Sequence, residues 1–257
     1  MYQYLGNTGI LLYNSLGIFS LPLILWYHFA QYSRKRKLLS GTGRRVQSWF
    51  ARKTNGQFLS GERVWVALEI LLFASVQWLL IGPLNVNFGP LVATGANYFG
   101  TLFFMPLILM ALSTLLGTNP MKQLDLLTPA FPLILTFTKA ACFCQGCCRG
   151  IKTRFGMFNH ATQSMEFPVQ LVEMFFAICI FIILLKWRDK VKEGAMYPIY
   201  AILYSGTRFF SEFLRCEENV WGILKTYHIL CILGMIYGIA GYLLVGIFRE
   251  KINQRYQ

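Results

Sequence analysis

Long apolar blocks separated by short polar segments run through the whole chain. From these blocks we predict about seven spanning helices, at Tyr4–Tyr32, Val64–Ile81, Tyr98–Leu116, Leu126–Phe143, Pro168–Trp187, Tyr197–Leu214 and Thr226–Phe248. A helix needs about 20 mainly apolar residues to cross a hydrocarbon core of about 30 Å, and most of the blocks are close to that length. The pattern therefore predicts an all-α, polytopic helical bundle in a membrane, with residues 1–257 forming a single transmembrane domain.

The composition agrees with residence in a membrane. Hydrophobic residues make up 55% of the 257 residues and charged residues only 14%, whereas a soluble domain carries about 25% charged residues. The net charge of +13 is compatible with nucleic-acid binding, but the basic residues lie in short segments between apolar blocks. Positive charge in such segments orients membrane proteins and meets anionic headgroups. We therefore expect membrane lipids as partners and no nucleic acid.

The basic segments also predict an orientation. The densest of them follows the first apolar block, and we predict that residues 34–63 form a basic cytoplasmic or interfacial loop. Cytoplasmic loops are rich in lysine and arginine, so the N-terminus should lie outside and the C-terminus inside. Basic residues at 186–192 and 249–255 fit the same orientation. The first block has no basic residue before it, and we predict that it is retained rather than cleaved as a signal peptide.

The sixth block contains charged residues where lipid-facing side chains would be apolar. Tyr200, Tyr204, Arg208 and Glu212 recur at every fourth residue, which places them along one stripe of a helix. Ionisable groups inside a spanning helix cost about 2.5–3.5 kcal/mol and usually have a function. One interpretation is an ion pair that only neutralises itself. The other is that Arg208 binds a phosphate, Glu212 orients it or accepts a proton, and Tyr204 offers a hydroxyl.

The fourth and fifth blocks carry further polar residues. Lys139 lies deep enough in the fourth block to require a partner, and Gly146 and Gly150 would allow close approach of backbone or ligand. Gln170 and Glu173 in the fifth block are three residues apart and share a face. That face should look into protein, either to shape a site or to join helices.

Four of the seven cysteines lie within 142–148. Their order, C-x-C-x2-C-C, matches no standard zinc spacing, so we predict no metal and no cofactor. A disulfide on the outer side remains an alternative. Small buried packing residues are the preferred interpretation.

Three segments, taken in order, resemble the prolipoprotein diacylglyceryl transferase family. KAACFCQGCCRG at Lys139–Gly150 looks like the family form RxGCFxxGCCxG, with lysine at the arginine position. FPVQLVE at Phe167–Glu173 is similar to HPxQLYE, and SGTRFFSEFLR at Ser205–Arg215 is similar to GxxRFxxEFxR. Asp125 and Pro129 fit the family's DxxxP spacing, and Tyr98 is the polar residue nearest to the expected HGGL element.

The resemblance implies an enzyme that transfers diacylglyceryl from phosphatidylglycerol to the lipobox cysteine thiol of a prolipoprotein and releases glycerol phosphate. It also implies a bacterial plasma membrane protein with its active site facing the outer leaflet. Carried over by position, the catalytic residues would be Arg208, Glu212 and Lys139. The substrate-binding residues would be Tyr204, Gln145, Gly146, Gly150, Gln170, Glu173 and Tyr98.

Three other functions stay open at this point. The first is a related transferase that moves a lipid group to a different acceptor. The second is a non-catalytic protein that binds or transports phospholipid on the same scaffold. The third is a membrane thiol-redox protein built on the clustered cysteines. Incubation with phosphatidylglycerol and a lipobox peptide separates diacylglyceryl transfer to a lipobox cysteine from these three alternatives.

Overall fold

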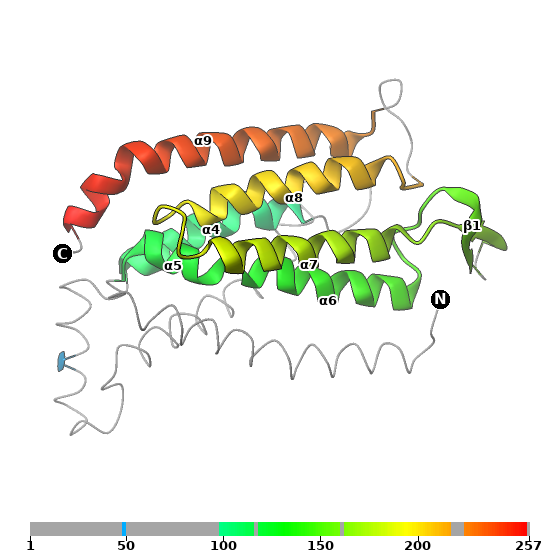
Figure 1. Cartoon of the computed structure of the whole chain (residues 1–257), viewed down its shortest axis with the longest axis horizontal. Helices are drawn as coiled ribbons and strands as arrows, with labels where there is room; N and C mark the ends of the chain where they lie inside the picture. Colours follow the sequence, from blue (N-terminus) through cyan, green and yellow to red (C-terminus); the bar gives the residue numbers. More distant parts are fainter. Residues whose placement is uncertain (1–47, 50–97, 116–117, 160–161, 217–223, 256–257) are drawn as a thin grey trace. The chain divides into compact units, whose positions relative to one another are not determined.

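The computed structural model describes residues 48–49, 98–115, 118–159, 162–216 and 224–255. After a helical fragment at Ser48 and Trp49, the elements follow in the order α4 (Phe99–Leu115), α5 (Pro120–Leu127), α6 (Ala130–Gln145), β1 (Lys152–Asn159), β2 (Ser164–Glu166), α7 (Val169–Trp187), α8 (Met196–Glu212) and α9 (Thr226–Arg255) (Figure 1). The chain divides into two compact units. The first contains Thr128–Lys190 and Tyr200–Ile236, and the second contains the described residues within Phe29–Leu127 together with Val191–Ile199 and Tyr237–Gln257.

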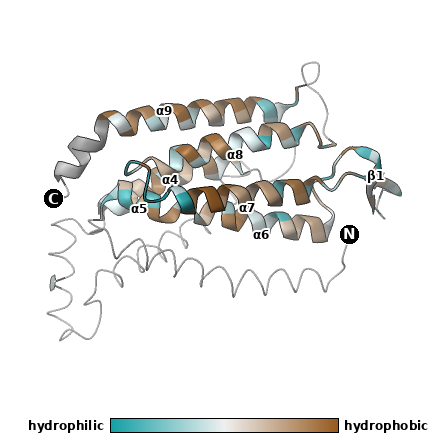
Figure 2. Ribbon diagram, viewed as in Figure 1, coloured by the Kyte–Doolittle hydropathy of each residue, from teal (hydrophilic) through white to brown (hydrophobic). Residues whose placement is uncertain are grey.

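The described residues are mostly helical, and three of their helices are long and apolar enough to cross a membrane: Pro120–Cys144, Val169–Trp187 and Thr226–Ile247. Figure 2 shows α7 and α9 coloured as hydrophobic over most of their length. These helices confirm a helical membrane protein. The blocks Tyr4–Tyr32 and Val64–Ile81 lie outside the described residues, as does the 34–63 loop apart from Ser48 and Trp49. The count of seven, the orientation and the single domain therefore stay predictions.

The fourth predicted block begins earlier in the structure than the sequence indicated. The apolar pattern predicts a start at Leu126, but the helical segment begins at Pro120 and is interrupted by a turn at Thr128 and Pro129. The side chain of Asn119 accepts hydrogen bonds from the backbone N–H groups of Met121 and Lys122, at 3.0 and 3.3 Å. This is an N-terminal cap, and proline is favoured at the next position. Capping therefore starts the helix before the apolar run does.

Asp125 fixes the start of α8 within the second unit. Its buried carboxylate accepts hydrogen bonds from the backbone N–H groups of Gly194, at 2.7 Å, and Met196, at 3.1 Å. A negative charge at a helix N-terminus is favourable, and the first N–H groups of a helix have no partner within it. Tyr197 follows Met196 in α8, and its hydroxyl donates a hydrogen bond to the carbonyl of Leu102, at 2.6 Å. The aspartate of the DxxxP spacing thus positions a helix.

A β-hairpin joins α6 to α7 in the first unit, which the all-α prediction did not include. Its strands are antiparallel, with Phe158 opposite Met165 and Asn159 opposite Ser164. Glu166 is buried at its end and accepts a hydrogen bond from the side-chain amide of Asn159, at 2.7 Å. The hairpin returns the chain to the start of α7, which packs beside α6 (Figure 1).

Candidate anionic-ligand site

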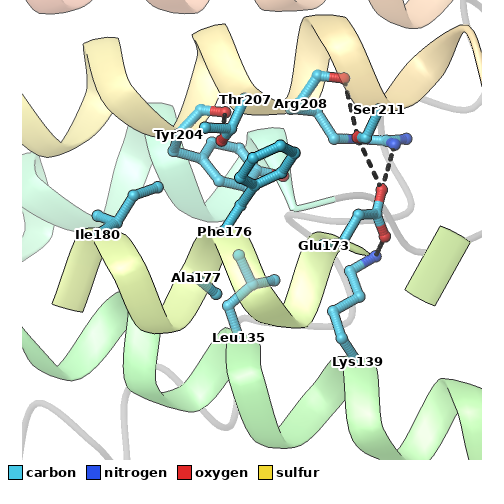
Figure 3. A pocket seen from close by; sticks show the side chains of 10 residues that line it. All are labelled: Leu135, Lys139, Glu173, Phe176, Ala177, Ile180, Tyr204, Thr207, Arg208 and Ser211. Atoms are coloured by element: carbon cyan, nitrogen blue, oxygen red, sulfur yellow. Dashed lines mark hydrogen bonds and ion pairs between the residues drawn. The ribbon is translucent and has the colours of Figure 1, made fainter. Parts of the chain in front are cut away.

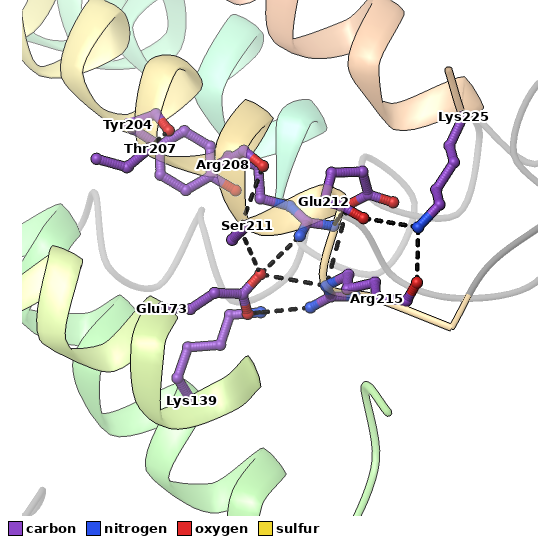
Figure 4. Close-up of polar contacts among 9 residues, drawn as sticks. All are labelled: Lys139, Glu173, Tyr204, Thr207, Arg208, Ser211, Glu212, Arg215 and Lys225. Atoms are coloured by element: carbon purple, nitrogen blue, oxygen red, sulfur yellow. Dashed lines mark hydrogen bonds and ion pairs between the residues drawn. The ribbon is translucent and has the colours of Figure 1, made fainter. Parts of the chain in front are cut away.

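The site is built around Glu173, a buried carboxylate in the second turn of α7. Three cations contact it: Lys139 from α6 at 2.8 Å, Arg208 from α8 at 2.6 Å and Arg215 from just beyond α8 at 3.0 Å (Figure 4). The Ser211 hydroxyl donates a further hydrogen bond to the carboxylate, at 3.2 Å. Glu173 therefore brings together three segments that are far apart in the sequence.

Glu212 is the second carboxylate of the cluster. It pairs with Arg208 at 2.7 Å, one helical turn away, and lies 4.0 Å from Arg215. The ammonium of Lys225 donates to the backbone carbonyls of Glu212 and Arg215, at 2.7 and 2.6 Å. The cluster thus contains four cations and two carboxylates, which leaves a formal charge of +2 over these six residues. Net positive charge held away from water favours binding of an anion.

The guanidinium of Arg208 is held on several sides. Its two terminal nitrogens contact different carboxylates, Nη1 with Glu173 and Nη2 with Glu212. It also lies over the ring of Tyr227, 5.3 Å from the ring centroid, where a cation is attracted to the aromatic face. A planar fork of donors held in this way is suited to two oxygen acceptors at once.

The cluster lines one end of a cavity between α6, α7 and α8 (Figure 3). Lys139, Glu173, Arg208 and Ser211 form its polar end. Its far end is apolar and is formed by Leu135, Phe176, Ala177 and Ile180, with Tyr204 and Thr207 also in the lining. The open volume is about 10 Å³, roughly the room for one water molecule. A larger anion can enter only if the ion pairs rearrange.

The structure places five of the ten predicted site residues at or beside this cavity. Lys139, Glu173, Arg208, Glu212 and Tyr204 come together as described, and the last of these stacks on Tyr200. Tyr98, by contrast, belongs to the second unit, in the turn before α4. The predicted contact of Tyr98 with substrate stays a prediction.

The residues between α6 and α7 have structural contacts of their own. Gly146 ends α6 with a left-handed backbone (φ 69°), and its N–H donates to the carbonyl of Phe143. The side chain of Gln170 is buried and donates to the carbonyl of Cys147, so it joins α7 to the segment after α6. The side chain of Gln145 lies outside the described part of the structure.

Sequence reasoning did not select three polar residues that the structure adds to the cluster, namely Arg215, Ser211 and Lys225. Arg215 had a signal, because it is the last residue of the GxxRFxxEFxR form and lies three residues after Glu212. Lys225 had none. Its role depends on how the segment between α8 and α9 returns to the end of α8, and nothing in the local pattern specifies that path.

Three of the clustered cysteines lie close to the cation cluster. The sulfur atoms of Cys142, Cys147 and Cys148 all lie within 4.8 Å of one another. Hydrogen bonds with Cys142 and Cys147 lower the pKa of the Cys148 thiol, with smaller contributions from the charges of Lys139 and Arg215. Cys144 is buried, as a packing residue would be, but Cys147 is exposed. The packing interpretation is therefore wrong for Cys147.

Gly150 sits where three backbone segments meet. It forms a β-bridge with Arg215, and a side-chain carbon at this position would overlap the carbonyl oxygen of Phe167 and crowd that of Leu214. The sequence predicted that backbone or ligand approaches this glycine closely, and in the structure it is the backbone of Phe167 and Leu214 that does so. It holds the segment that carries Arg215 against the start of α7.

We expect Gly150→Ala to lower both thermal stability and ligand binding, because the bridge to Arg215 must open to admit a methyl group. The free energy of unfolding should fall by about 1–3 kcal/mol, the range for overpacking at a filled site. Thermal unfolding of the purified chain measures it. Gly206→Ala in α8 is the matched control, because a carbon added there meets nothing within 4 Å. Equal unfolding temperatures for the two variants would contradict this account.

The fold and the site define a helical membrane protein with a buried, cation-rich cavity that is polar at one end and apolar at the other. The family model for prolipoprotein diacylglyceryl transferase matches residues 61–244. The chain belongs to this family.

Curated relatives agree with the family model. The chain is 32% identical over 188 residues to the phosphatidylglycerol–prolipoprotein diacylglyceryl transferase of Chlorobaculum tepidum, a match that covers 66% of this chain and 65% of the relative. It is 32% identical over 133 residues to phosphatidylglycerol–prolipoprotein diacylglyceryl transferase 2 of Clostridium perfringens, covering 48% of this chain and 52% of the relative. The chain thus spans between about half and two thirds of the length of these relatives.

Proposed function

We propose that this protein transfers the diacylglyceryl group of phosphatidylglycerol to the cysteine thiol in the lipobox of a prolipoprotein, and that glycerol phosphate is released. The observation that carries the proposal is the buried cluster around Glu173, in which cations outnumber carboxylates beside an apolar cavity end. A phospholipid has the same two parts, an anionic phosphate and an apolar tail. The names of the relatives give the reaction its substrates.

In the proposed complex the lipid phosphate takes the place of the Glu173 carboxylate. Both groups offer oxygen atoms to Arg208, Arg215 and Lys139, and the guanidinium groups can bind a phosphate through two parallel hydrogen bonds. The cavity is too small for a headgroup while these ion pairs are closed. Glu173 therefore serves as a counter-ion that the substrate displaces, and the apolar residues beyond it receive the first part of an acyl chain.

The reaction needs no nucleophile from the protein. The thiol sulfur of the prolipoprotein attacks the carbon of the diacylated glycerol that carries the phosphate. A carbon–sulfur bond forms as the bond between that carbon and the phosphate oxygen breaks. The electron pair of that bond leaves with glycerol phosphate, where the cations stabilise the developing charge. The thiol proton passes to a carboxylate, either Glu212 or the displaced Glu173. Lys139 and Arg208 hold the phosphate, and Glu212 orients Arg208.

We further propose a bacterial plasma membrane location with the site facing the outer leaflet. The charge pattern supports this orientation, since the most basic loop would then lie in the cytoplasm. Phosphatidylglycerol would reach the site from the surrounding membrane lipids, and the prolipoprotein would meet it after export.

The test uses the full chain purified in detergent, with phosphatidylglycerol and a lipobox peptide. Lipidated peptide, detected by mass, and glycerol phosphate should appear in equal amounts. A peptide with alanine in place of the lipobox cysteine is the control and should give neither product. Absence of both products, together with failure to support growth of a cell that lacks its own transferase, would overturn the proposal.

A further inference from the structure

Three thiols converge at the point where α6 ends. Cys142 lies in the last turn of the helix, and Cys147 and Cys148 follow it, with all three sulfur atoms within 4.8 Å of one another. Cys147 is exposed and the other two are half-buried, so the group can be reached from solvent. Among the residues that the structure describes, these cysteines form the one group of three or more potential metal ligands that lie close enough together for one ion.

The backbone explains why the spacing in the sequence did not predict this convergence. Gly146 adopts a left-handed conformation (φ 69°) and caps the helix, and the N–H of Cys147 then donates to the carbonyl of Cys142 at 3.1 Å. Cys148 is also left-handed (φ 57°), which is rare for a residue other than glycine. Two reversals in three residues fold the chain back over the helix end. Adjacent cysteines can then reach the same point as Cys142.

We propose that Cys142, Cys147 and Cys148 form a binding site for a thiophilic closed-shell metal ion, Zn(II) or Cu(I). Thiolates are the ligands that these ions prefer in proteins. Three sulfurs bound to one ion at about 2.3 Å lie about 4 Å apart, so binding needs only a small contraction of the group. Zn(II) would complete a tetrahedral site with one water molecule, whereas Cu(I) is satisfied by three sulfurs. Binding releases the thiol protons to solvent.

The surroundings favour this site electrostatically. Three thiolates with Zn(II) carry one net negative charge, and with Cu(I) two. The positive charges of Lys139 and Arg215 act on the thiol group and belong to the cluster with an excess of cations. The ion would also fix the position of the segment that Gln170 contacts through the Cys147 carbonyl. Its expected effect is to hold the chain beside the anion site.

The test measures ion binding to the full chain purified in detergent, reduced, freed of metal and kept anaerobic. One arm adds Zn(II) and the other Cu(I), each in competition with a chromogenic chelator. We expect one ion per chain in at least one arm, with Cys142, Cys147 and Cys148 protected from alkylation as read by peptide mass. Cys147→Ser, at an exposed position, should weaken binding at least about 100-fold, because it removes a direct ligand and loss of an outer-shell partner alone costs about 10–100-fold.

Cys144→Ser and Cys179→Ser are the controls, because these cysteines lie outside the group of three, and their ion binding should equal that of the natural sequence. Binding below one ion per chain in both arms, or unchanged binding by Cys147→Ser, would overturn the proposal. So would a disulfide among the three cysteines that resists mild reduction. The assay contains no lipid or peptide, so its result is independent of the proposed transferase activity.

Discussion

Replacing Arg208 by lysine is expected to lower the rate of diacylglyceryl transfer by about 10²–10³-fold, the usual effect of removing one donor from a transition-state charge site. Lysine keeps the positive charge but places it on a single nitrogen. Arg208 reaches Glu173 and Glu212 through separate nitrogens, at 2.6 and 2.7 Å, and the same fork would hold the phosphate. The initial rate of peptide lipidation at saturating phosphatidylglycerol measures the effect.

The matched control is Arg188→Lys. Arg188 lies just past the end of α7 and pairs with Asp189 at 3.7 Å, away from the residues that line the cavity. Its substitution should leave the rate unchanged. Thermal unfolding of both variants separates loss of chemistry from loss of fold. A folded Arg208→Lys protein with the natural rate would show that Arg208 does not hold the phosphate.

Some helix ends and some contacts within one helix could be predicted from the sequence. The predicted start of α9 at Thr226 and end of α7 at Trp187 agree with the structure, because apolar runs end there in polar residues. The pair of Arg208 and Glu212 was also predictable, since residues four apart on a helix are neighbours. These features depend on local order alone, which a single sequence contains.

Contacts between distant segments could not be predicted from periodicity. Lys139 and Arg215 meet at Glu173 because α6, α7 and the end of α8 pack together, and no spacing rule specifies that packing. The cysteine group and the hairpin depend on left-handed residues and on buried hydrogen bonds of Glu166, which apolar patterns do not report. Motif order indicated that these segments belong to one site, but it gave no indication that a carboxylate lies at the centre.

Replacing Glu173 by glutamine should have the largest effect on stability. The substitution leaves Lys139, Arg208 and Arg215 facing one another without the carboxylate that all three contact. Removing one partner from a buried ion pair destabilises a protein by about 3–5 kcal/mol. The expected result is a marked fall in unfolding temperature, measured in detergent at low salt. Asp189→Asn, which alters an exposed carboxylate, should change it little.

The same variant tests whether Glu173 occupies the position of the substrate phosphate. A ligand that binds only the folded state raises the unfolding temperature, and at a given concentration a tighter ligand raises it more. Glycerol phosphate should therefore stabilise Glu173→Gln more than the natural protein, in which it must first displace the carboxylate. Raising the salt concentration with chloride serves as the control for general screening. If glycerol phosphate raises both unfolding temperatures equally, the anion binds elsewhere and Glu173 has a structural role only. A larger shift in the variant would place the phosphate among the three cations.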